Sequence, residues 1–77
     1  MSKLLIAMNP LTVETGTHII TTNTAYWFDF EKCIKKEITV AEYENGTRRK
    51  YTSKVHFNSR EDLTIEYFRV KEIKENL

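Results

Sequence analysis

The dipeptide Asn45-Gly46 lies between two runs in which apolar and polar residues alternate. Asn-Gly favours the tight turns that join antiparallel strands, because a type I′ turn requires positive φ at both central residues. The sequence therefore predicts a β-hairpin over residues 37–57. A two-residue loop would pair Glu42 with Arg49 and Val40 with Tyr51, and these pairs combine opposite charges or apolar side chains.

This predicted register sorts the side chains of the hairpin onto two faces, because successive residues of a strand point to opposite sides. One face is predicted to belong to the core and holds Ile38, Val40, Tyr51, Val55 and Phe57. The other face is predicted to be solvated and holds Thr39, Ala41, Tyr43, Arg48, Lys50, Thr52, Lys54 and His56.

Three further strands are predicted upstream of the hairpin, over Lys3–Met8, Thr17–Thr22 and Thr24–Glu31, with Pro10 and Gly16 in a loop. Downstream, the alternation of apolar residues favours a strand over Leu63–Val70. A helix is the open alternative there, because Ser59 could cap it and Asp62 follows three positions later. The tail Lys71–Leu77 is expected to be helical or frayed.

The resulting fold class is all-β, with a short C-terminal helix as the alternative element. We expect a single small domain, 1–77, built as an antiparallel meander that curls into a partly open barrel. A chain of 77 residues buries only about 60–65% of its unfolded surface, so its stability should be modest. A homo-oligomer is therefore an expected way to cover further apolar surface.

The stretch Thr24–Phe30 is unusually aromatic, and its rings do not keep to one face. If Tyr26, Phe28 and Phe30 point into the core, then Trp27 points away from it. The sequence favours burial of Trp27 beneath another segment of the fold over its use as an exposed anchor for a partner.

Charge and aromatic content yield two sets of candidate binding residues. The favoured interpretation is a contact with another protein through the aromatic stretch and the hairpin tip, using Tyr26, Trp27, Asp29, Glu42, Glu44 and Arg49. The alternative is binding of RNA or single-stranded DNA through Tyr43, Arg48, Lys50, Lys54 and His56. A net charge of +1 does not favour the alternative, because nucleic-acid binders usually carry a basic excess. The cluster Lys32, Lys35 and Lys36 is not expected to extend this basic set.

No combination of residues in the sequence predicts a catalytic or metal-binding site. Cys33 is the only cysteine, and with His18 and His56 it matches no familiar metal-ligand spacing. We therefore expect no catalytic residue, no metal and no cofactor. The apolar run Leu4–Met8 is too short for a signal peptide or a membrane span, so we expect a cytoplasmic protein without membrane contact. The sequence thus favours a non-enzymatic binding module, an inhibitor or regulator, with an origin in a phage suggested by its composition.

Overall fold

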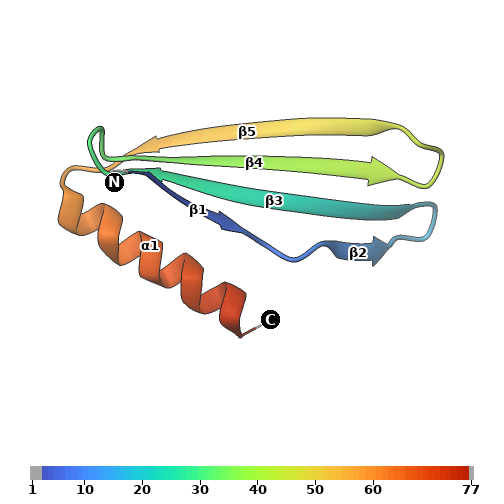
Figure 1. The fold of residues 1–77 in the computed structure, drawn as a ribbon. Helices are drawn as coiled ribbons and strands as arrows, with labels where there is room; N and C mark the ends of the chain where they lie inside the picture. Colours follow the sequence, from blue (N-terminus) through green and yellow to red (C-terminus); the bar gives the residue numbers. More distant parts are fainter. Residues whose placement is uncertain (1–2, 77) are drawn as a thin grey trace.

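The computed structural model describes residues 3–76. Within them, five strands precede one helix: β1 (Lys3–Ala7), β2 (Leu11–Glu14), β3 (Ile19–Asp29), β4 (Ile34–Tyr43), β5 (Arg48–His56) and α1 (Arg60–Glu75). All strand pairs are antiparallel. The sheet has the order β1-β3-β4-β5, with β2 also paired to β3 (Figure 1). The predicted antiparallel meander is confirmed, and the sheet does not close.

The long central strand β3 replaces two predicted strands. Asn23, which separated them in the sequence, pairs with Val40 and continues the ladder. The segment expected to be a loop contains β2, in which Leu11 pairs with Thr22. Pro10 lies between β1 and β2, and a proline cannot donate a main-chain hydrogen bond to the ladder. The two short strands therefore share one interrupted edge of β3.

The hairpin of β4 and β5 has a register that differs by one residue from the predicted one. Glu42 pairs with Arg48, and Val40 pairs with Lys50. The loop has three residues, because the Tyr43 carbonyl accepts a hydrogen bond from the Gly46 amide and the Tyr43 amide donates to Thr47. Gly46 alone in this loop has positive φ, at 87°. The loop is therefore a type I turn followed by a bulged glycine and not a type I′ turn.

This shift moves β5 to the other face relative to β4, so the predicted core set is wrong. Ala41, which was expected to be solvated, is buried. Tyr51 and Val55, which were expected in the core, are 54% and 41% exposed. Phe57 does pack against the core, at its edge.

The favoured strand over Leu63–Val70 is also wrong, and the helical alternative is confirmed. The Ser59 hydroxyl accepts a hydrogen bond from the Asp62 amide at 3.1 Å, as an N-cap does. The alternating pattern is misleading because Ile65, in its middle, is 69% exposed on the outer side of the helix. Leu77, the end of the predicted tail, lies outside the described residues.

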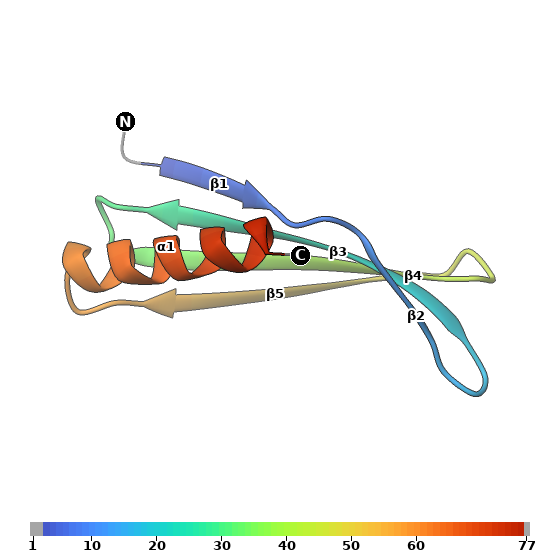
Figure 2. The ribbon, with the colours of Figure 1, turned by 90° about the horizontal axis from the view of Figure 1, so that it is seen from below.

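The core lies between α1 and one half of the sheet (Figures 1 and 2). Its buried residues are Ile6, Phe28, Leu63 and Val70, and Phe28 and Leu63 are fully buried. The Tyr67 ring meets Phe28 edge to face, with centroids 5.2 Å apart. The other half of the sheet, with β2 and the hairpin loop, extends beyond the helix (Figure 2).

An ionic clasp holds α1 to β4 at the margin of this core. The Glu66 carboxylate accepts a hydrogen bond from Lys35 of β4 and two from Arg69 of its own helix, at 2.6 and 2.8 Å. The guanidinium of Arg69 and the ammonium of Lys35 lower the pKa of Glu66 from 4.5 to about 2, against the opposing effect of burial. The ionised form of Glu66 therefore stabilises the docked helix.

We expect Leu63→Ala to lower the free energy of unfolding by about 3 kcal/mol, because it leaves a cavity beside Phe28. Urea denaturation followed by circular dichroism measures this change. Ile65→Ala is the matched control and should alter stability by less than about 0.5 kcal/mol, because Ile65 is exposed on the same helix. Equal effects of the two variants would contradict the described packing of α1.

Glu66→Gln should lower the free energy of unfolding at neutral pH and should also remove part of its dependence on pH. In the native protein, the stabilisation by Glu66 is complete above pH 4.5 and is lost as the pH falls towards about 2, because the folded-state pKa is the lower one. The variant should therefore be less stable at neutral pH and should approach the native protein near pH 2. Urea denaturation at several pH values checks this, with the exposed Glu72→Gln as control. A constant difference between variant and native protein across this range would contradict the clasp.

Candidate functional site

The face of the sheet opposite α1 is not covered by any other described element. Phe28 points into the core, so its neighbour Trp27 points to the opposite side. Paired residues share a face, and the ladder places Leu5, Trp27, Lys36 and Lys54 in one row across four strands. We call this surface the open face. It comprises Lys3, Leu5, Ala7, Thr21, Asn23, Ala25, Trp27, Asp29, Ile34, Lys36, Ile38, Val40, Glu42, Arg48, Lys50, Thr52, Lys54 and His56.

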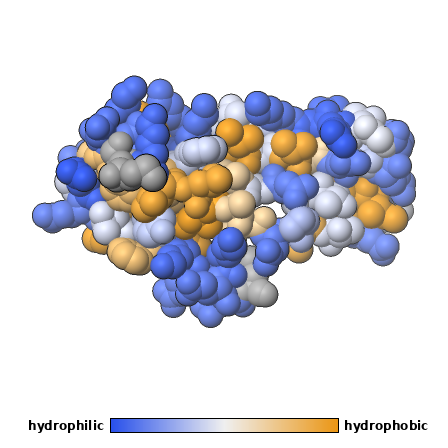
Figure 3. All heavy atoms as spheres, in the orientation of Figure 1, coloured by the Kyte–Doolittle hydropathy of each residue, from blue (hydrophilic) through white to orange (hydrophobic). Residues whose placement is uncertain are grey.

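The centre of the open face is apolar. Trp27 is 44% exposed and Leu5 is 50% exposed, and Ile34 and Ile38 beside them are half-buried. The space-filling view shows apolar side chains among hydrophilic ones over the strands (Figure 3). The expectation that the fold covers Trp27 is therefore wrong, because α1 packs on the other face.

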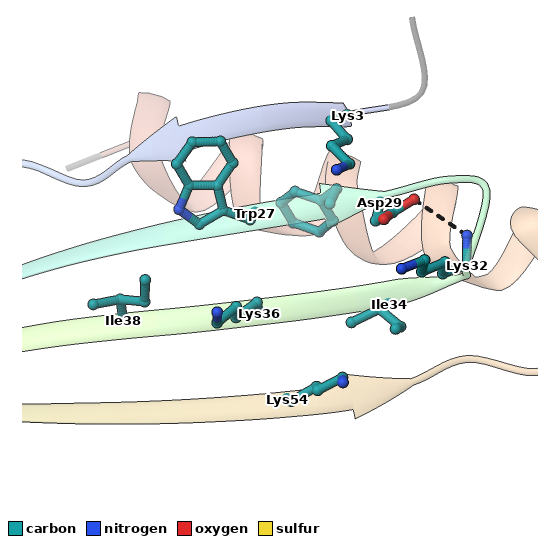
Figure 4. Close-up of a pocket in the computed structure, with 9 residues that line it drawn as sticks. Lys3, Trp27, Asp29, Lys32, Ile34, Lys36, Ile38 and Lys54 are labelled. Carbon is teal, nitrogen blue, oxygen red and sulfur yellow. Dashed lines mark hydrogen bonds between the residues drawn. The ribbon is translucent and has the colours of Figure 1, made fainter.

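Four lysines surround this apolar centre. A depression of about 490 Å³ is lined by Trp27, Ile34 and Ile38 and by the lysines (Figure 4). The lysines are Lys3, Lys32, Lys36 and Lys54. The ion pairs found in residues 3–76 join Lys35 and Arg69 to Glu66 and Arg48 to Glu42, and they include none of these four. The depression therefore combines an accessible indole with cations that lack an acidic partner in the described part of the chain.

The turn between β3 and β4 engages Asp29, the acid beside these lysines, in main-chain hydrogen bonds. The Asp29 carboxylate accepts hydrogen bonds from the main-chain amides of Glu31, at 3.0 Å, and of Lys32, at 3.2 Å. Figure 4 shows the second of these bonds. Cys33 completes the turn with φ 57°, and its carbonyl accepts a hydrogen bond from the Phe57 amide. Asp29 thus shapes the turn that places Lys32 at the rim of the depression.

The predicted protein-binding set is divided between the two faces. Trp27, Asp29 and Glu42 lie on the open face, whereas Glu44 lies in the hairpin loop. Arg49 pairs with Ala41 on the face that carries α1. Tyr26 lies on that face too, with the Lys35 ammonium 5.8 Å from its ring centroid. Burial and then the carboxylate of Glu37 raise the pKa of the Tyr26 hydroxyl.

The predicted nucleic-acid set lies together except for its aromatic residue. Arg48, Lys50, Lys54 and His56 share the open face. Tyr43 lies on the opposite face and meets His18 edge to face, with ring centroids 6.0 Å apart. Trp27, and not Tyr43, is therefore the ring that accompanies these cations.

Sequence reasoning missed that the two basic clusters meet. Lys36 pairs directly with Lys54, and Lys32 lines the same depression, whereas Lys35 points to the helix. The predicted hairpin was the signal that could have revealed this, because residues equally far from the turn of a hairpin lie side by side on neighbouring strands. The side chains that sequence reasoning did not assign to the site are Lys3, Leu5, Lys32, Ile34, Lys36 and Ile38.

Comparisons of the chain with models of known protein families, with curated proteins and with solved structures find no match. In the described residues, no cluster of three or more His, Cys, Asp and Glu side chains could hold a metal ion. The helix in residues 3–76 lacks the combination of length and apolar character that crossing a membrane would require.

Quenching of tryptophan fluorescence should report the charge of the open face, because Trp27 is the only tryptophan. We expect the ratio of iodide quenching to caesium quenching to be higher for Trp27 than for free N-acetyltryptophanamide, since the unpaired lysines attract anions. Lys36→Gln combined with Lys54→Gln should weaken quenching by iodide about twofold and leave quenching by neutral acrylamide unchanged. Lys71→Gln, on the helix, is the control. A ratio of iodide to caesium quenching no higher than that of free N-acetyltryptophanamide would contradict this description of the site.

Proposed function

We propose that this protein is a small non-enzymatic module that binds another protein through its open face, with Trp27 as the anchor. The observation that supports the proposal is the exposure of Trp27 and Leu5 at the apolar centre of an uncovered sheet face. Contiguous exposed apolar surface marks interaction sites in small proteins, and tryptophan is enriched among the residues that dominate binding energy.

The dimensions of the molecule support the view that the sheet lacks a covering layer on its open face. Its accessible surface is 5788 Å², compared with about 4,900 Å² expected for a compact protein of this mass. Its radius of gyration is 14.5 Å, compared with about 11.5 Å expected for this length. A partner that covers the open face would supply the layer that a sheet normally has on its second side.

The lysines around Trp27 define the chemistry of that partner. A polar rim around an apolar centre is the usual anatomy of an interface, and complementary charge selects the partner. The partner surface should therefore be apolar at its centre and acidic around it. Two copies of the chain would not pair through their open faces, because the lysines around each Trp27 would approach those of the other copy. The proposal includes inhibition or regulation of a larger protein in the cytoplasm, and the richness in Lys, Ile, Asn and Thr suits an origin in a phage.

Affinity capture from a nuclease-treated native lysate tests this proposal. A protein partner should be retained by the native chain, and Trp27→Ala should weaken its binding at least about tenfold. Phe68→Ala is the matched control, because Phe68 is an aromatic residue exposed on the outer side of α1. Thermal unfolding should show both variants folded. Retention of the same partner by Trp27→Ala, or its loss with both variants, would overturn the proposal.

Binding of single-stranded nucleic acid is the second candidate function. It is supported by the placement of Trp27 on the same face as Lys36, Lys50 and Lys54, since a base can stack on the ring while cations contact phosphates. Fluorescence anisotropy of a labelled oligothymidylate tests it. Binding should then fall steeply with salt, and Lys50→Glu combined with Lys54→Glu should abolish it. Absent or salt-independent binding would contradict this candidate.

A further inference from the structure

The outer edge of β5 is the longest unpaired strand edge in the described part of the chain. β5 lies at the end of the strand order, and all of its nine residues are exposed. The opposite edge of the sheet is formed by β1 and β2, which have five and four residues and are interrupted at Pro10. An uninterrupted edge of this length presents a row of free main-chain donors and acceptors.

The hydrogen bonds of the hairpin show which main-chain groups of β5 point outward. The Tyr43 amide donates to the Thr47 carbonyl, and the Phe57 amide donates to the Cys33 carbonyl, both at 2.8 Å. Hydrogen-bonded pairs alternate along an antiparallel ladder, so the odd-numbered residues of β5 bond to β4. The even-numbered residues therefore direct their amides and carbonyls to solvent. They are Arg48, Lys50, Thr52, Lys54 and His56.

The residues with free main-chain groups are the same residues whose side chains lie on the open face. Any strand that pairs with Lys50 and Lys54 places its opposing side chains on that face, close to the ammonium groups. Its alternate side chains fall on the other face, beside the exposed Tyr51 and Val55. A strand that complements this edge should therefore have acidic residues at every second position and apolar residues between them.

We propose that the outer edge of β5 binds an extended segment of a partner protein, as an added strand that alternates acidic and apolar residues. This inference rests on the proposed protein contact and specifies the partner further. A second copy of the chain does not meet the requirement, because antiparallel pairing of two β5 strands about Thr52 places Lys50 opposite Lys54. Like charges directly opposite each other destabilise such a pairing.

A synthetic peptide provides the direct probe. Its nine residues alternate glutamate with valine, which matches the length of β5. Titration with amide hydrogen exchange followed by NMR should show binding together with protection of the even-numbered amides, those of Lys50, Thr52 and Lys54. A peptide that alternates lysine with valine should bind at least about tenfold more weakly. Methylation of alternate amide nitrogens of the glutamate peptide, on the edge that would donate to β5, should abolish binding.

Thr52→Pro is the matched variant of the protein. It removes an amide that points outward and leaves the ladder with β4 intact, a position at which proline is tolerated. It should weaken peptide binding at least about tenfold, and Lys50→Glu combined with Lys54→Glu should reverse the preference to the lysine peptide. Equal binding of the two peptides, no binding, or binding without protection of these amides would overturn the proposal.

Trp27→Ala separates this inference from the proposed open-face contact. The edge is two strands away from Trp27, so the variant should bind the glutamate peptide within about twofold of the native protein. If the variant lost the peptide, the peptide would lie on the open face and the edge proposal would fail. Normal peptide binding with partner capture that is insensitive to Trp27→Ala would instead overturn the open-face proposal alone.

Discussion

The packing of α1 on Phe28 divides the sheet into one covered face and one uncovered face. Phe28 is fully buried in one cluster with Leu63 and Val70 of the helix, and the Glu66 clasp fixes the helix against β4. The single helix of 16 residues packs on one side of the sheet, and no described element packs on the other side (Figure 2). Trp27, adjacent to Phe28 in the strand, is therefore exposed by the same contact that buries its neighbour. The candidate site is a direct consequence of the core.

The same division separates the charges of the molecule. On the covered face, Lys35 and Arg69 both form ion pairs with Glu66. On the open face, Lys36 and Lys54 lie side by side without an acidic partner in residues 3–76. The net charge of +1 averages over these two environments. Composition alone therefore understates the attraction of the open face for an anionic surface, because binding depends on local charge and not on the sum.

Local sequence signals predicted the position of the hairpin better than they predicted which side chains lie on which face of the sheet. Asn45-Gly46 does reverse the chain, but a two-residue loop and a three-residue loop both accept this dipeptide and differ in the backbone of Asn45. That single difference inverts the side-chain pattern of β5 relative to β4. The predicted strand over Leu63–Val70 was wrong for another reason. The alternation of apolar residues is short, and the segment forms a helix that begins at the Ser59 cap. Trp27 was found from the sequence because its place out of phase with three core aromatic residues does not depend on the hairpin register.

The two proposed contacts use one set of cations in different ways. Lys50 and Lys54 have side chains on the open face and free main-chain groups at the edge, so β5 belongs to both surfaces. A partner strand added to β5 would extend the sheet and enlarge the open face by one row of acidic side chains. These acids would pair with the β5 cations, which oppose the pairing of two β5 edges. The charges that protect the free edge are thus the same charges that select the strand able to cover it.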